Sequence, residues 1–108
     1  MPKTESGFQG RLIQEIRELF PGCVILKNDP NYLQGVPDLI ILFGKYWAAL
    51  ECKADISSKH QPNQDHYVEY MDEMSYAAFV YPDNKEQVLH ELQSTLRPHR
   101  QARISQCQ

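Results

Sequence analysis

The segment that most constrains the fold is GVPDLIILFGKYWAALECK, in which two apolar runs flank Gly44-Lys45. Short runs rich in isoleucine, leucine and aromatic residues are typical of β-strands, and a glycine that opens a two-residue turn permits a tight hairpin. Apolar residues occupy both alternating faces of the two runs. This pattern predicts a central pair of strands that is covered on both sides. The open end of the hairpin nevertheless carries three charged residues.

Counting outward from the turn places these charges relative to one another. If Phe43 faces Tyr46, the register brings Asp38 opposite Glu51, and Lys53 lies two residues further along on the same face. Directly opposed side chains have their Cβ atoms about 4.5–5.5 Å apart. Two carboxylates this close repel each other unless a proton or a cation intervenes. The sequence therefore indicates either a divalent metal site or an internal salt bridge in which Lys53 neutralises one acid.

The metal interpretation assigns a definite chemistry to the hairpin end. Magnesium takes oxygen ligands from carboxylates and backbone carbonyls, so Asp38, Glu51 and the backbone carbonyl of Cys52 are the expected ligands. The ammonium group of Lys53 would orient a water molecule and offset phosphate charge. A site of this kind suits in-line hydrolysis of a phosphodiester bond.

The elements around the hairpin follow from periodicity and from helix and turn signals. Helices are predicted over residues 4–20, from Pro62 to Met74 and from Asp83 to Leu96, and strands at residues 23–28, 38–43, 46–53 and 76–81. The order α-β-β-β-α-β-α predicts an α/β fold with a four-stranded mixed sheet flanked by helices. We expect one domain over residues 1–96, followed by a basic, solvated tail at 97–108 that has three arginines and no acids.

Two helices of this arrangement carry polar residues on their apolar sides. Glu5 and Gln9 project onto the buried side of the first helix, whereas Glu15 lies near its edge and is an alternative candidate acid. Buried polar groups need partners, which a metal site beneath the helix would provide. Otherwise Glu5 lies in water at the start of the helix. Gln64 lies on the buried stripe of the next helix, where it either supports the site or caps the helix.

Composition limits the class of protein. The 108 residues carry a net charge of −3, which disfavours a non-specific nucleic-acid coat but allows DNA binding through local basic groups and metal ions. The sequence contains no apolar run of the roughly 20 residues that a membrane span needs. The three cysteines form no CxxC pair, which disfavours a zinc site and fits the reduced thiols of a cytoplasm.

Two polar segments beside the hairpin are candidate DNA contacts. Lys27, Asn31 and Tyr32 lie in or next to the loop that precedes the Asp38 strand, and Lys59 and His60 follow the Lys53 strand. Each segment either contacts the DNA backbone or is simply a solvated turn.

These residues resemble a known family. Pro37-Asp38 followed by Glu51-x-Lys53 resembles the PD-(D/E)xK nuclease signature. The stretches ESGFQ and GVPDL, together with Gln64, more specifically resemble the small stand-alone VRR-NUC (virus-type replication-repair nuclease) proteins of phages and bacteria. The likeness extends over nearly the whole expected domain.

The resemblance implies a restriction-endonuclease-like core and a Mg²⁺-dependent endodeoxyribonuclease, with Mn²⁺ able to substitute. It assigns metal binding to Asp38 and Glu51, the catalytic lysine to Lys53, the first-helix acid to Glu5, and supporting roles to Gln9 and Gln64. It further implies a homodimer acting on branched DNA such as Holliday junctions, in repair or recombination, in the cytoplasm of a bacterial or phage-infected cell. The alternatives are a non-catalytic branched-DNA-binding module of the same fold and an interaction protein whose charges form only a salt-bridge network.

Overall fold

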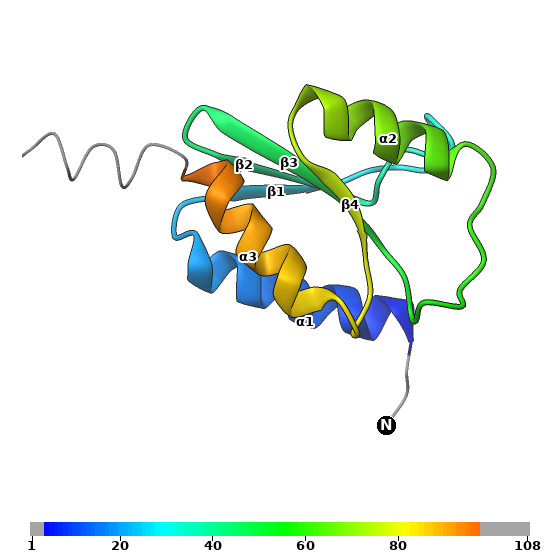
Figure 1. Cartoon of the computed structure of the whole chain (residues 1–108), viewed down its shortest axis with the longest axis horizontal. Helices are drawn as coiled ribbons and strands as arrows, with labels where there is room; N and C mark the ends of the chain where they lie inside the picture. Colours follow the sequence, from blue (N-terminus) through cyan, green and yellow to red (C-terminus); the bar gives the residue numbers. More distant parts are fainter. Residues whose placement is uncertain (1–3, 98–108) are drawn as a thin grey trace, which may run out of the picture.

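The computed structural model describes residues 4–97, and the rest of the expected tail lies outside the described residues. Its elements are α1 (Glu5–Leu19), β1 (Val24–Lys27), β2 (Leu39–Phe43), β3 (Tyr46–Cys52), α2 (Gln64–Met74), β4 (Ala77–Val80) and α3 (Lys85–Leu96) (Figure 1). The predicted order of helices and strands is confirmed. The protein is an α/β protein with a four-stranded mixed sheet and three helices among the residues described.

The sheet has the strand order β1-β2-β3-β4, so the predicted hairpin is central. The pairs β1–β2 and β2–β3 are antiparallel, whereas β3–β4 is parallel. The hairpin register is the predicted one, because Phe43 pairs with Tyr46 and Leu39 with Leu50. Gly44 has a φ of 61°, a conformation that glycine adopts without steric cost, and this explains its place in the turn.

Two helices cover one face of the sheet and one helix covers part of the other (Figure 1). The larger core joins α1 and α3 to the strands; it contains Phe8, Leu12, Ile16, Leu39, Ile41, Leu50, Val80, Val88, Leu92 and Leu96, among others. The smaller core lies on the opposite face, where Val68 of α2 packs with Ala49 and Ala77. Ala49 of β3 thus belongs to the smaller core, whereas its neighbours Ala48 and Leu50 belong to the larger one. Both faces of β3 are buried, as the apolar pattern of this strand predicts.

The cover of the second face is incomplete, which differs from the sequence prediction. Val24 and Leu26 of β1 are 51% and 47% exposed, and Leu42 of β2 is 38% exposed. The reason is the position of α2, which contacts β3 and β4. The prediction of cover on both sides is therefore right for β3 and wrong for the outer part of β2.

Both ends of the described chain are held by specific contacts. The Thr4 side chain caps α1 by accepting a hydrogen bond from the Gly7 amide at 3.0 Å. Arg97 donates to the carbonyl of Leu19, and its guanidinium lies 5.0 Å from the Phe20 ring centroid. The first residue of the expected tail thus packs against the body instead of being solvated. No helix within residues 4–97 is long and apolar enough to cross a membrane.

Candidate metal centre

Three carboxylates from three parts of the chain meet at one end of the sheet. Glu5 opens α1, Asp38 directly precedes β2, and Glu51 lies near the end of β3. One oxygen from each lies within 4.8 Å of the others. The alternative acid, Glu15, is not part of this cluster, because its carboxylate pairs with Lys85 at 2.9 Å. Of the two candidate acids of α1, the fold therefore brings Glu5 to the hairpin end.

Glu51 is the most enclosed member of the cluster, with only 2% of its surface exposed. Its Oε2 accepts a hydrogen bond from Gln64 Nε2 at 2.9 Å. Its Oε1 is buried and receives no hydrogen bond from any donor in residues 4–97. A buried polar atom without a partner is costly, and a cation would satisfy it. The donor set, which consists of three carboxylates, is the kind that magnesium prefers.

Burial raises the pKa values of all three acids, and repulsion from neighbouring carboxylates adds to the rise for Glu51 and Glu5. The pKa of Glu51 rises to about 8, first because of burial and next because of the Asp38 charge, while Lys53 at 3.9 Å offsets only part of this. Burial also raises the pKa of Asp38, against the stabilising hydrogen bond that its Oδ2 accepts from the Cys52 amide at 3.0 Å. The pKa of Glu5 is raised by burial and then by Asp38. The three acids therefore hold protons more readily than free carboxyls do, and Glu51 ionises fully only above about pH 8.

Lys53 is held in place by oxygen atoms from the chain that follows it. It is only 4% exposed, and its Nζ donates to Gln64 Oε1 at 2.8 Å and to the Lys59 carbonyl at 3.0 Å. The amide of Gln64 therefore bridges Lys53 and Glu51, with its oxygen toward the lysine and its nitrogen toward the acid. These two contacts give the expected supporting role of Gln64 a structural basis. The Gln64 side-chain oxygen also accepts a hydrogen bond from the backbone amide of Gln61, as the alternative role of a local cap would require.

Gln9 and the sulfur of Cys52 lie beside the cluster without belonging to it. The Gln9 side chain forms a hydrogen bond with the Cys52 thiol. The pKa of this thiol rises to about 12, mainly through burial and then through the charge of Asp38. The thiol therefore stays protonated and is a poor metal ligand. The supporting role of Gln9 and the Cys52 carbonyl as a ligand both stay predictions.

The candidate DNA contacts differ in how far their side chains are already engaged within the protein. Lys27 is exposed, and its charge is close enough to Asp38 to lower the pKa of that carboxyl. Asn31 and Tyr32 are exposed on the loop between β1 and β2. The side chain of Lys59 is also exposed, while its carbonyl holds Lys53. Lys27 and Lys59 thus lie next to residues of the hairpin end, whereas DNA contact by Asn31 and Tyr32 stays a prediction.

His60 is more constrained than the sequence suggested. Its ring stacks on Phe79 at 4.1 Å between centroids, and its Nδ1 lies 2.7 Å from Asp65 Oδ1. Both contacts are made within the protein. A structural role in closing the loop after β3 thus accounts for His60 as well as a phosphate contact does.

Sequence reasoning missed two positions that align the loops around the site. Gly35 has a φ of 94°, and a Cβ there would lie 2.6 Å from the Asn63 Cβ. Asn63 itself has a φ of 71°, just before Gln64. The two backbones approach so closely that only glycine fits at position 35. The sequence contains a signal for the turn, the glycine in GVPD, but none for its partner.

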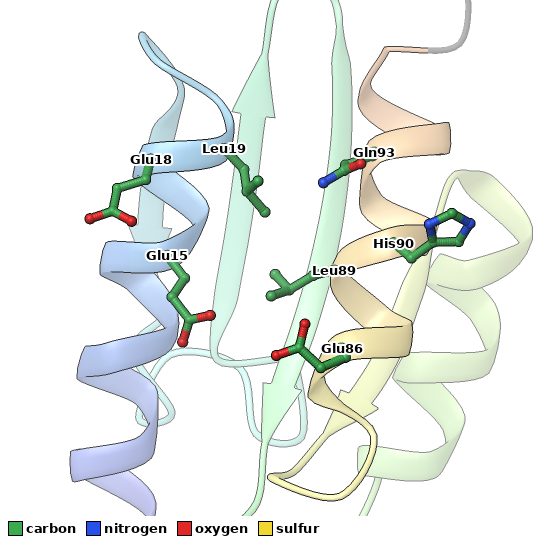
Figure 2. A pocket seen from close by; sticks show the side chains of 7 residues that line it. All are labelled: Glu15, Glu18, Leu19, Glu86, Leu89, His90 and Gln93. Carbon is green, nitrogen blue, oxygen red and sulfur yellow. The ribbon is translucent and has the colours of Figure 1, made fainter.

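A groove with a volume of about 450 Å³ lies between α1 and α3. Figure 2 shows Glu15 and Glu86 pointing toward each other across this groove. Lys85 pairs with both carboxylates, at 2.9 and 3.5 Å. Glu18 adds a further negative charge to the lining. Because carboxylates repel phosphate, this groove does not suit a nucleic-acid backbone.

Fold and site together define an α/β protein with three carboxylates and a buried lysine at the open end of a central hairpin. No protein-family model, curated protein or solved structure matches the chain.

Proposed function

We propose that this protein is a Mg²⁺-dependent DNA endonuclease with a restriction-endonuclease-like core, of the VRR-NUC type that its motifs resemble. The observation that carries the proposal is the convergence of Glu5, Asp38 and Glu51 within 4.8 Å, with the Nζ of Lys53 3.9 Å from Glu51. A salt bridge alone does not account for this arrangement, because one ammonium leaves either unbalanced carboxylates or a proton on Glu51, whose pKa is about 8. A divalent cation would balance the remaining charge.

The carboxylates of Glu5, Asp38 and Glu51 would hold the cation. When bound, the ion supplies a Lewis acid for the phosphate and a nucleophilic water near neutral pH. The protein holds two of these carboxylates in fixed positions. Asp38 is fixed by the Cys52 amide, and Glu51 by Gln64, so neither carboxylate has to reorganise when substrate arrives.

Lys53 would supply a second positive charge at the site, in addition to that of the metal ion. Two of its N–H groups are engaged by Gln64 and by the Lys59 carbonyl, which leaves the third for a phosphate oxygen or the attacking water. Its nearly complete burial keeps bulk water from screening this charge. By family resemblance, the products would carry 5′-phosphates and the preferred substrate would be branched DNA.

The direct test is cleavage of a labelled substrate panel that includes linear duplex, flap, nicked and four-way-junction DNA, with and without Mg²⁺. Lys53→Met is the informative variant, because methionine keeps much of the side-chain volume and removes the charge. Lys45→Met is the matched control, since Lys45 is exposed in the turn at the other end of the hairpin. Metal-dependent cleavage that is lost only in Lys53→Met supports the proposal. Undiminished cleavage by Lys53→Met contradicts it.

The same panel separates the alternative, a branched-DNA-binding module that does not cut. Tight junction binding without metal-dependent nicking would favour that module. The three acids and the lysine argue for the enzyme, because mere binding of phosphates would be better served without carboxylates at the contact.

The homodimer implied by the resemblance has a suitable surface in the uncovered part of the sheet. Val24 and Leu42 pair in register across β1 and β2, and Leu26 lies on the same face. A second copy that contacts this face about a two-fold axis would bring the patch against itself. Each half-exposed side chain would contribute roughly 1 kcal/mol on burial. The contact would extend to Trp47, which pairs with Leu42.

A further inference from the structure

A small hollow beside the metal centre suggests what kind of DNA the protein selects. It has a volume of about 300 Å³ and lies in the loop between β1 and β2, where Asn28, Asp29, Tyr32, Leu33 and Val36 line it. Tyr32 is 88% exposed and Leu33 45% exposed. Tyr32 and Leu33 thus present apolar surface around a concave site, and ligand pockets are commonly lined in this way.

The loop is held in a defined shape. The Asp29 carboxylate accepts a hydrogen bond from the Asn31 amide at 2.9 Å, and the Asp29 carbonyl accepts from the Tyr32 amide at 3.1 Å. On the other side, Gly35 packs directly against Asn63. These contacts hold the loop that carries Tyr32 in the unbound protein, which lowers the entropic cost of binding through it.

Asn28, which lines the hollow, is hydrogen-bonded to the backbone next to the candidate metal centre. The amide of Asn28 donates to the carbonyl of Asp38 at 2.8 Å, and its side-chain amide donates to the carbonyl of Pro37. Lys27, the residue before Asn28, is near enough to influence the Asp38 carboxyl. A DNA backbone placed with one phosphate at the carboxylates and the next near Lys27 would bring a base toward the hollow.

We propose that this hollow, defined by Tyr32, Leu33 and Val36, binds one unpaired nucleobase of the DNA substrate, next to the phosphate at the metal centre. The base would stack on the Tyr32 ring and contact Leu33 and Val36, while Asp29 provides an acceptor at the polar rim. Stacking of this kind needs a base that is out of the duplex stack. It would favour DNA with unpaired bases over continuous duplex. The inference rests on the proposed function, because it takes DNA as the ligand.

The test measures binding to duplexes that carry a one-nucleotide adenine bulge, an abasic site at the same bulge, or no bulge. Binding is measured by fluorescence anisotropy in Ca²⁺, with EDTA as a second condition. Loss of one base stack weakens binding roughly 5- to 100-fold. Tyr32→Ala should therefore bind the adenine bulge at least about fivefold more weakly, and Tyr32→Phe should bind it about as well as wild type. Wild type should prefer the adenine bulge to the abasic one, and Tyr32→Ala should show no such preference.

The matched control is Tyr70→Ala, which removes an exposed tyrosine of α2 and should leave the preference unchanged. An equal loss of affinity for all three duplexes in Tyr32→Ala would overturn the inference, because Tyr32 would then contact only the backbone. An unchanged affinity would also overturn it. The readout is independent of cleavage. A protein that cuts DNA without discriminating bulges disproves the base site alone, whereas one that discriminates bulges but never cuts disproves the nuclease alone.

Discussion

Replacing Glu51 by glutamine separates a metal centre from a salt-bridge network. Three carboxylates within 4.8 Å and one ammonium at 3.9 Å leave Glu51 with two repulsions and one attraction. At an effective dielectric constant of about 20, each repulsion is worth roughly 3.5 kcal/mol and the attraction about 4 kcal/mol. The net cost of an ionised Glu51 is thus on the order of 3 kcal/mol, before burial adds to it. The glutamine keeps an oxygen for the Gln64 amide and removes this cost.

The sign of the pH dependence follows from the raised pKa of Glu51. Between its ordinary value of 4.5 and about 8, the folded protein binds a proton that the unfolded chain has already lost. The free energy of unfolding therefore falls as pH rises through this window, by at most about 1.4 kcal/mol per pH unit for this group. The glutamine of Glu51→Gln does not titrate, so this group causes no fall in the free energy of unfolding of the variant. In EDTA it should match wild type near pH 4.5 and be more stable at pH 9, by about 3–5 kcal/mol or roughly 15–30 °C in Tm.

Magnesium should narrow the gap between the two proteins. A ligand at 100 times its Kd stabilises the folded state by about 2.7 kcal/mol, and wild type should gain this at pH 8, whereas Glu51→Gln should gain little. The assay is thermal melting by circular dichroism in EDTA and in Mg²⁺ from pH 4.5 to 9. Glu69→Gln, which neutralises an exposed acid on α2, is the control and should behave as wild type. Equal magnesium stabilisation of wild type and Glu51→Gln would refute the reasoning.

Three further outcomes are expected. Lys53→Met should lower metal-dependent cleavage by at least about 100-fold, in single-turnover assays, while Lys45→Met stays at the wild-type rate, since a positioned group of this kind typically contributes 10²–10⁴-fold. Gly35→Ala should destabilise the fold by about 1–3 kcal/mol in urea unfolding, because a Cβ meets Asn63 and the φ is positive; an unchanged midpoint would show that the loops yield freely. Leu42→Lys should prevent self-association in sedimentation experiments, and the emission of the single tryptophan should shift to the red on dilution of the wild type only; a wild type that is monomeric at all concentrations would rule out the dimer.

Local pattern alone was enough to predict the hairpin and its register. Gly44 permits the tight turn, and side chains alternate with a period of two, so the positions of Leu39 and Leu50 relative to each other follow by counting. The same counting placed Asp38 and Glu51 at one end. These relations depend on residues close in sequence, and the structure has them as predicted.

Tertiary packing decided which acid of the first helix joins this pair. Periodicity put Glu5 and Glu15 on related sides of the helix, but the direction in which α1 crosses the sheet determines which of them meets β3. The bridge from Lys53 through Gln64 to Glu51 likewise depends on where α2 begins, which the position of Pro62 predicted only to within two residues.

The same limit applies to the surfaces. The apolar pattern of β2 is the same whether its outer face is covered or bare, so only the position of α2 over β3 and β4 shows that Leu42 is exposed. The hollow around Tyr32 arises because a loop folds back on Asp38 and packs against Asn63 through Gly35. Such contacts join residues far apart in the chain. Their geometry is set by the packing of whole elements, which no local periodicity encodes.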